Sequence, residues 1–588
     1  MKKLSLALIP AGCLLLCAAL RYHNAAGAQK AAGEFQSFTQ TMFQKEITAS
    51  TLTLHYTLEN PTDYGITDYP VTFGNTEEIS LVLSASPSAQ QYLQMLSEIS
   101  YSDLSRQNQI TYDVLLLALE NEKKAEALAL YQEPLGPTIG IQAQLPVLLS
   151  EYTFSDKADI EEYLSLIAQT DTYFASLLKF ERARSAAGLF MSNKNADAIL
   201  AQCRSFIGSG DAADNLLVTI FNEKLDALDF LSAGERAQFK AENQKAVAEH
   251  VIGAYELLIE GLETLKGTGQ NENGLCYFPY GKAYYEYLMQ SSVGSYLSVD
   301  AIEQRIRNQL SKDVLACRAL LLEYPSAASG EHLEGILTDP EEILVQLQQK
   351  MSDDYPAAPQ TSCSVKYVHK SLEDFLSPAF YLTPPIDNPT ENVIYINRAG
   401  VSSPLELYTT LAHEGYPGHL YQNVSSGNYL DPVRALFSFG GYTEGWATYV
   451  EMESYDYALP DSASGAAKAE AEYRRLNRSV MLGLSSLLDI CIHYRGYTRE
   501  QTAAFLKSLG FTNPDSADAI FDAIIEAPAN YLKYYLGYLS FLDLRSYCSQ
   551  NWPEAFDLKD FHRQILQIGP APFPVVEKYL KLYYNTNK

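Results

Sequence analysis

The spacing of hydrophobic residues predicts helices along most of the chain. Between residues 33 and 266, apolar side chains return every three or four positions, and polar turns separate the runs. In residues 112–130, for example, Leu115, Ala118 and Leu119 fall on one face of a helix. The sequence has no fixed-period repeat and no low-complexity tract. The pattern therefore indicates a mainly α protein.

Two features divide this helical pattern. Residues 267–274 form a polar break, the predicted boundary between an N-terminal helical lobe (29–270) and a C-terminal helical lobe (271–588). Residues 364–368 and 393–397 are short and rich in β-formers, and helical patterning then returns. We expect a small β-sheet just before the helix that follows.

The N-terminus carries an export pattern. Two lysines precede an apolar run over residues 4–20, and Ala26-Gly27-Ala28 offers a small-residue cleavage site. This predicts a signal peptide or membrane anchor over residues 1–28, and an extracellular or cell-surface location. The run is longer than many signal cores and shorter than most spanning helices, so an uncleaved anchor stays open as a membrane tether. A lipid attached at Cys13 and a buried N-terminal helix are further alternatives.

Composition narrows the class of partner. The chain has 43 Lys and Arg against 71 Asp and Glu, a net charge of −28, which argues against binding to nucleic acid. The apolar content of 47% is that of a globular protein. The cysteines after residue 28 form no C-x-x-C pair, which excludes a zinc knuckle and leaves both disulfides and buried thiols open. The 42 tyrosines mostly indicate packing between helices, with a peptide- or sugar-binding groove as the alternative.

Helix-start signals lead into a metal-binding pattern. Ser403 is the predicted N-cap, Pro404 suits the first helical position, and Glu406 completes a capping box. The same helix carries His413 followed directly by Glu414. Zinc hydrolases place a metal ligand beside a general base in this way. We therefore predict His413 as a zinc ligand and Glu414 as the general base.

The second histidine departs from the usual H-E-x-x-H spacing. The position four after His413 is Pro417, and His419 follows only at the sixth position. Six residues of continuous helix rotate by about 240° and rise by about 9 Å, which separates two imidazoles. Pro417 and Gly418 allow the last turn to open and return His419 to the metal. The alternative is a helix end with an incidental histidine.

A third ligand is predicted at Glu444, 25 residues after His419. It lies near the start of the next predicted helix, as in zinc peptidases with two His ligands and one Glu ligand. This set leaves one coordination position for a water molecule that Glu414 could deprotonate. Glu451 lies two turns beyond Glu444 on the same face. It either supports the ligands through a hydrogen bond or is a carboxylate on the surface.

The two motifs resemble a known family. His-Glu-x-x-Pro-Gly-His followed by Glu-Gly-Trp-Ala-x-Tyr-x-Glu is similar to the bacterial domain of unknown function 885 family, over roughly residues 35–585. One departure is Leu420, where the family often has a further His. The resemblance implies a gluzincin-like zinc metallopeptidase, with two helical lobes around a deep cleft and a small β-sheet beside the zinc helix. Further similar stretches are Pro279-Tyr280-Gly281 with Tyr284-Tyr285, Asp489 with His493, residues 496–500 and 528–537, and Phe561-His562.

The resemblance also implies two catalytic side chains. His493 would stabilise the oxyanion or bind substrate, oriented by Asp489, and Tyr534 would donate its hydroxyl to the tetrahedral intermediate. The alternative for both is a hydrogen-bonded core residue. The predicted strand at residues 393–397 could pair along its edge with an extended peptide.

These observations predict an exported, Zn²⁺-dependent peptidase with a peptide substrate. Glu414 would take the proton of the attacking water and pass it to the leaving amine. The alternatives are a non-catalytic exported peptide- or glycan-binding protein, and a zinc hydrolase of other amides or esters. A serine mechanism has no support, because residues 483–487 lack the closing glycine of a nucleophile elbow.

Overall fold

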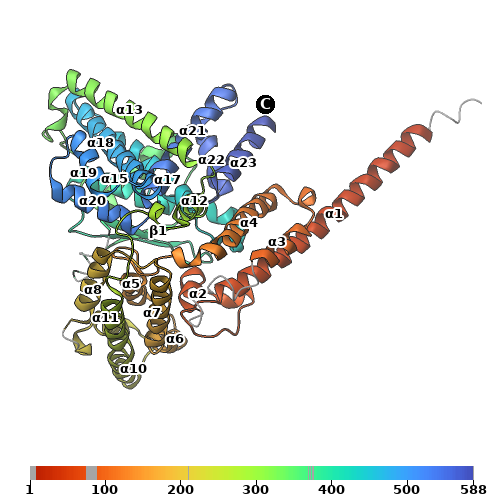
Figure 1. Ribbon diagram of the computed structural model, residues 1–588. Helices are drawn as coiled ribbons and strands as arrows, with labels where there is room; N and C mark the ends of the chain where they lie inside the picture. The colour runs from red at the N-terminus through yellow and green to blue at the C-terminus, as the bar shows by residue number, and fades with distance from the viewer. Residues whose placement is uncertain are drawn as a thin grey trace, which may run out of the picture.

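The protein is mainly helical with one small β-sheet, which confirms the predicted fold class (Figure 1). The computed structural model describes residues 8–74, 89–208, 211–368, 370, 373 and 377–586, and the side chains of these except 8–25 and Asn428. The helices up to residue 291 are α1 (Leu8–Ile47), α2 (Thr51–Thr57), α3 (Ala89–Ser97), α4 (Arg106–Ala125), α5 (Ile141–Glu151), α6 (Lys157–Ile167), α7 (Thr170–Ala186), α8 (Asn193–Ile207), α9 (Leu216–Ala227), α10 (Ala233–Ala246), α11 (Gly253–Leu265) and α12 (Gly281–Ser291). The later elements are α13 (Val299–Glu323), α14 (Pro340–Lys350), β1 (Ser362–Tyr367), β2 (Ala379–Leu382), β3 (Glu391–Ile396), α15 (Pro404–Glu414), α16 (His419–Ser426), α17 (Gly440–Tyr457), α18 (Gly465–Ile490), α19 (Arg499–Ser508), α20 (Pro514–Glu526), α21 (Asn530–Asn551), α22 (Leu558–Ile568) and α23 (Phe573–Thr586).

Helices α5–α11 pack around a hydrophobic core of their own. Tyr163, Phe174, Leu177 and Leu258 are among its fully buried side chains. In Figure 1 these helices form the lower part of the molecule, below the sheet and the C-terminal helices. Their amphipathic patterning, with one apolar face per helix, explains why they bury that face against one another.

Helices α1, α3 and α4 contribute to other cores. Phe35 of α1 clusters with Leu115 and Leu119 of α4 and with Val433 from the C-terminal half. Ala118, on the neighbouring side of α4, belongs to the main C-terminal core. The predicted apolar face of this helix is therefore buried as expected, although α4 begins at residue 106 and continues after residue 125 as a 3₁₀ helix.

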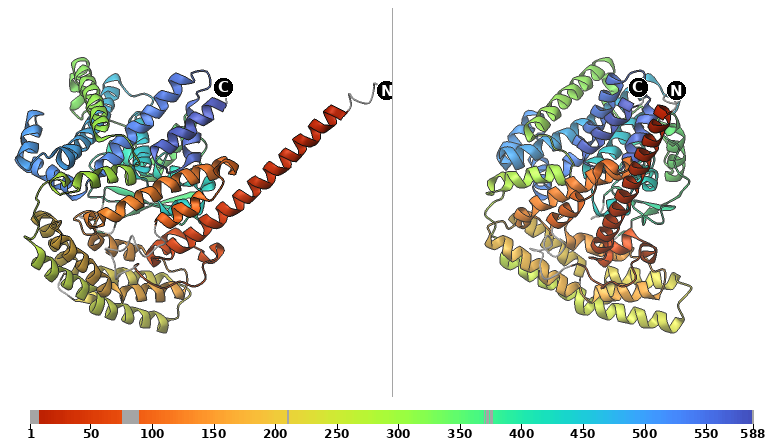
Figure 2. Two further views of the ribbon diagram at one scale, coloured as in Figure 1. Left: turned by 45° about the vertical axis from the view of Figure 1, so that its right-hand side comes forward. Right: turned by 90° about the vertical axis from the view of Figure 1, so that its right-hand side faces the viewer.

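The predicted export segment, residues 1–28, lies partly outside the described residues, which begin at Leu8. From there the chain is helical, and the first part of α1 projects from the body of the molecule (Figure 1 and Figure 2). Among the helices of the described residues, none combines the length and the apolar content needed to cross a bilayer.

The sheet has three strands in the order β1-β3-β2. Strand β1 pairs with β3 in parallel, and β2 pairs with β3 in antiparallel register, with Tyr381 opposite Ile394. Both predicted strands are present, each beginning two residues earlier than expected. Because β3 is flanked on both sides, the expectation that residues 393–397 offer a free edge to a peptide is wrong. The edge strand next to α15 is β2, which the sequence pattern did not reveal.

Helices α17 and α21 cross with their backbones in contact. A Cβ atom added at Gly445 would lie 2.5 Å from the Cα atom of Gly537, and one added at Gly537 would overlap the carbonyl oxygen of Gly441. Only glycine permits such an approach. The crossing brings Glu444 of α17 and Tyr534 of α21 to the wall of one cavity.

Candidate metal centre

Helix α15 presents His413 and Glu414 in its last turn. Its N-terminus is capped by the Ser403 side chain, which accepts the Glu406 N–H at 3.2 Å. The expected capping box is only half formed, because the Glu406 carboxylate accepts the N–H of Ser402 instead of Ser403. The helix ends at Glu414.

The chain then opens at the Gly415–Gly418 step, and α16 begins at His419. A Cβ atom on Gly418 would overlap the carbonyl oxygen of His413, so the backbone can turn this tightly only with glycine. The buried Trp446 of α17 donates its Nε1–H to the carbonyl oxygen of Pro417 at 2.8 Å and holds the turn in place. His419 is therefore not on the same continuous helix as His413, and the six-residue spacing does not separate the two rings.

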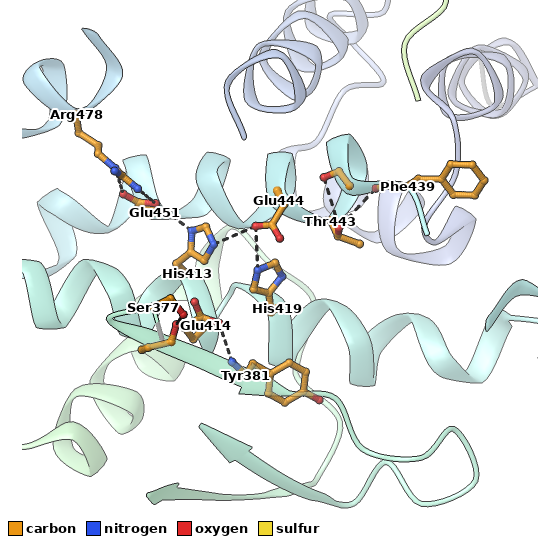
Figure 3. Close-up of polar contacts among 12 residues, drawn as sticks. Ser377, Tyr381, His413, Glu414, His419, Phe439, Thr443, Glu444, Glu451 and Arg478 are labelled. Carbon is orange, nitrogen blue, oxygen red and sulfur yellow. Dashed lines mark hydrogen bonds and ion pairs between the residues drawn. The ribbon is translucent and has the colours of Figure 1, made fainter. Parts of the chain in front are cut away.

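His413, His419 and Glu444 converge from three consecutive helices (Figure 3). One ligand atom from each lies within 4.8 Å of the others. The Glu444 carboxylate is 3.5 Å from His413 Nε2 and 3.4 Å from His419 Nε2, and the two imidazole centroids are 4.9 Å apart. The structure thus brings together the three residues predicted as ligands.

Glu451 and Arg478 fix the orientation of His413. Glu451 is 5% exposed, and its Oε2 lies 3.0 Å from His413 Nδ1, while Arg478 Nε donates to Oε1 at 2.8 Å (Figure 3). Burial alone would raise the pKa of Glu451, but Arg478 and His413 outweigh it and hold that pKa at about 2. Glu451 is therefore a buried carboxylate that keeps Nδ1 occupied and leaves Nε2 directed at Glu444.

The charges of the site favour a bound cation. Burial would lower the pKa of His413, but the carboxylates of Glu444, Glu451 and Glu414 outweigh this and raise it to about 10. For Glu444, burial acts to raise the pKa, yet hydrogen bonds from the two imidazoles hold it well below its usual range. Three carboxylates thus face two imidazoles in a largely enclosed site. Two imidazole nitrogens and one carboxylate oxygen are the donor set that zinc takes in hydrolases, so these residues fit Zn²⁺.

Glu414 lies beside the ligands and is held by the sheet. The Tyr381 N–H of β2 donates to Glu414 Oε2 at 2.9 Å (Figure 3). Burial raises the pKa of Glu414 despite the two neighbouring imidazoles. A carboxyl group with a raised pKa takes up a proton more readily, as a general base requires.

Tyr534, the predicted hydroxyl donor, lines the same cavity. Its ring centroid is 6.4 Å from that of His413, and burial, followed by the carboxylates of Glu444 and Glu414, raises the pKa of its hydroxyl. The hydroxyl therefore stays protonated and can act as a hydrogen-bond donor. The cavity has a volume of about 880 Å³.

His493 does not reach this group. It is 1% exposed and outside the cavity wall; its Nδ1 accepts the Leu275 N–H at 3.2 Å, and its Nε2 lies 2.8 Å from the Ile524 carbonyl oxygen. Asp489 does not orient it, because that carboxylate accepts from Tyr285 and from the Ala529 N–H. The expected placement of His493 at the reaction centre is wrong, since both ring nitrogens serve the backbone.

Sequence reasoning missed two contributors, Arg478 and the Tyr381 N–H. Glu451 gave an indirect signal for the first, because a carboxylate two turns after a candidate metal ligand on a buried face needs a cationic partner. The sequence gives no sign of the Tyr381 contribution, because the donor is a backbone N–H that every residue except proline carries.

Two solved structures share this fold. A candidate lipoprotein from Colwellia psychrerythraea aligns with a TM-score of 0.80 at 19% identity, covering 95% of this chain and 100% of that chain. A candidate lipoprotein of unknown function from Shewanella oneidensis aligns with a TM-score of 0.62 at 16% identity, covering 93% and 99%. A comparison with curated proteins gave no match. A family model described as "Bacterial protein of unknown function (DUF885)" matches residues 84–580, so the chain belongs to the DUF885 family.

Proposed function

We propose that this protein is an exported zinc-dependent peptidase of the gluzincin-like kind. The observation that carries the proposal is the convergence of His413, His419 and Glu444, with Glu414 directly beside them. The contact between Glu451 and His413 Nδ1 also supports the proposal, because metal-binding histidines commonly donate the N–H of their other ring nitrogen to a carboxylate.

His413, His419 and Glu444 would hold the zinc. When bound, zinc supplies Lewis acidity, which polarises a carbonyl group and lowers the pKa of water. Glu414 takes the proton of the attacking water and later delivers it to the leaving nitrogen, while the Tyr381 N–H keeps its carboxylate in place. The neutral hydroxyl of Tyr534 donates a hydrogen bond to the developing oxyanion.

The cavity supports a peptide as the substrate. A volume of about 880 Å³ is ample for several residues. Residues 379–381 of the edge strand β2 line the cavity, and the Tyr381 N–H points away from β3 toward Glu414. An extended peptide could lie along this edge, close to the catalytic carboxylate.

An exported or cell-surface location accompanies this proposal. The lysines and apolar run at the N-terminus favour export, with a possible tether to the membrane. The two structures of the same fold are described as candidate lipoproteins, which is compatible with that location.

Metal analysis combined with peptide hydrolysis tests the proposal. Wild-type protein loaded with Zn²⁺ should retain about one zinc per chain and cleave members of a mixed peptide library. Glu414→Gln should keep the zinc and lose about 10²–10⁴-fold in turnover, because only the proton acceptor is removed. Parallel panels of esters and acyl amides separate a peptidase from another zinc hydrolase. Wild-type protein that binds peptides without zinc and without turnover would instead be a binding protein.

A further inference from the structure

Two arginines of α18 face the cavity beside the metal centre. Arg474 and Arg478 lie four residues apart, one helical turn, and therefore project from the same face. Their side chains are 42% and 43% exposed, although the protein as a whole carries a net charge of −28. Cationic groups gathered at one point of an acidic protein call for an explanation in terms of what they bind.

The carboxylates of the cavity do not fully occupy these arginines. Glu451 engages Arg478 through Nε and Nη2 but also serves His413. Glu470 accepts the His332 N–H at 2.9 Å, and its ion pair with Arg474 is long, at 3.7 Å. Within the described part of the chain, Arg474 makes no other polar contact, and its side chain lines the cavity.

The position of the pair relates it to the scissile bond. Only the carboxylate of Glu451 stands between Arg478 and the imidazole of His413. The two contacts that join Arg478 Nε to His413 Nδ1 across this carboxylate are 2.8 Å and 3.0 Å long. Because an extended chain advances by about 3.5 Å per residue, a group bound at the arginines belongs one or two residues from the bond cleaved at the metal centre.

We propose that Arg474 and Arg478 form a carboxylate-binding subsite that selects substrates with a negative charge one or two residues beyond the scissile bond. Planar guanidinium groups suit a carboxylate, whose two oxygens can accept parallel N–H donors. The carboxylate belongs either to the C-terminus of a short peptide or to an acidic side chain. The subsite rests on the proposed peptidase function and gives that function its substrate class.

Matched peptide pools test the subsite. Tetrapeptide pools with a free C-terminal carboxylate, with a C-terminal amide, and with an amide plus one Glu are supplied to zinc-loaded wild type, Arg474→Gln and Arg475→Gln. Arg475 is the matched control, because it is the adjacent residue, pairs with Glu472 and does not line the cavity. Retention of the same pools on immobilised protein is measured for the same three proteins with Glu414→Gln added to each, which reports on the arginines without turnover.

The wild type should cleave the free-acid pool with a kcat/KM at least about tenfold above the amide pool, the size expected for one charged hydrogen-bonded contact. Arg474→Gln should lose that preference in both cleavage and retention, and Arg475→Gln should keep it. Recovery of the preference by the Glu-containing amides would identify an acidic side chain as the source of the carboxylate. Equal cleavage and retention of all pools by the wild type, or an unchanged preference in Arg474→Gln, would overturn the subsite and leave the peptidase standing. Absence of cleavage of every pool by zinc-loaded wild type would overturn the peptidase, and the retention ratios would then decide the subsite alone.

Discussion

Replacing Glu451 with Gln tests whether the orientation of His413 matters for metal binding. The substitution keeps the size of the side chain and removes its negative charge. Glu451 now accepts from His413 Nδ1 at 3.0 Å and from Arg478 Nε at 2.8 Å. An amide has one acceptor oxygen and a donor group, so Gln could serve only one partner and would turn N–H groups toward the other.

The size of the effect follows from these contacts. Leaving a buried donor such as the Nδ1–H of His413 unpaired costs about 1–3 kcal/mol. A cost of about 1.4 kcal/mol is a tenfold change in an equilibrium constant, so zinc affinity should fall by about 10–100-fold. Arg478 contributes less to the loss, because its side chain is 43% exposed and water can replace the missing partner.

Zinc affinity is measured by competition with a chromophoric chelator. Glu453→Gln is the matched control. Glu453 is a carboxylate on the same helix α17, and it accepts hydrogen bonds from Tyr355 and Arg545, neither of which is a candidate metal ligand. Glu453→Gln should lower the free energy of unfolding and leave the zinc Kd within about twofold, as expected when no partner of a ligand is lost. A zinc Kd in Glu451→Gln equal to that of wild type would refute the role given to Glu451.

Three further outcomes are expected. Gly445→Ala should lower the free energy of unfolding by about 1–3 kcal/mol in urea denaturation, because its Cβ meets the backbone of α21. Gly253→Ala, which has open space around the added Cβ, should not lower it, and equal stabilities of the two variants would contradict the close crossing. Tyr534→Phe should lower kcat by about 100-fold with zinc content and KM unchanged, and an unaffected kcat would remove Tyr534 from the mechanism. Burial lowers the pKa of His493 from 6.5 to about 4, so the unfolded chain takes up the proton first as the pH falls. The free energy of unfolding of the zinc-free protein should therefore fall by up to about 3 kcal/mol between these two pH values. This loss should be smaller in His493→Gln. An equal dependence of the free energy of unfolding on pH in both proteins would show that His493 is not held neutral.

The sequence predicted the helices and most of the local site. Periodic apolar residues identified α4, because a helix buries its face whatever it packs against. The Pro-Gly step predicted the break after Glu414, because glycine and proline act on the backbone at their own positions. The three candidate ligands lie within a stretch of 32 residues, from His413 to Glu444, so short-range patterns sufficed to connect them.

Long-range placements could not be predicted in the same way. Strand β2 has only four residues, and it becomes a strand by pairing with β3. His493 lies four residues after a carboxylate on a helix, which suggested that Asp489 orients it. Instead, Asp489 receives the N–H of Ala529 just before α21, and the ring of His493 ties two distant backbone segments together. A spacing rule cannot distinguish these two uses of one histidine, since both require a buried ring with satisfied nitrogens.

The arginines of α18 illustrate where sequence patterns end and packing begins. Arg474, Arg475 and Arg478 have the same chemistry and lie within five positions, yet only the first and last face the cavity. Which face of α18 turns inward is decided by its contacts with the preceding helix α17 and with α13 and α21, which lie further away in the chain. Once that face is fixed, Arg478 neutralises the carboxylate that orients His413, and Arg474 stands one turn further along the cavity. The rotation of this one helix therefore sets both the support of the candidate metal ligand His413 and the charge that lines the cavity. Under the proposed function, a change that rotates α18 should alter zinc affinity and substrate preference together.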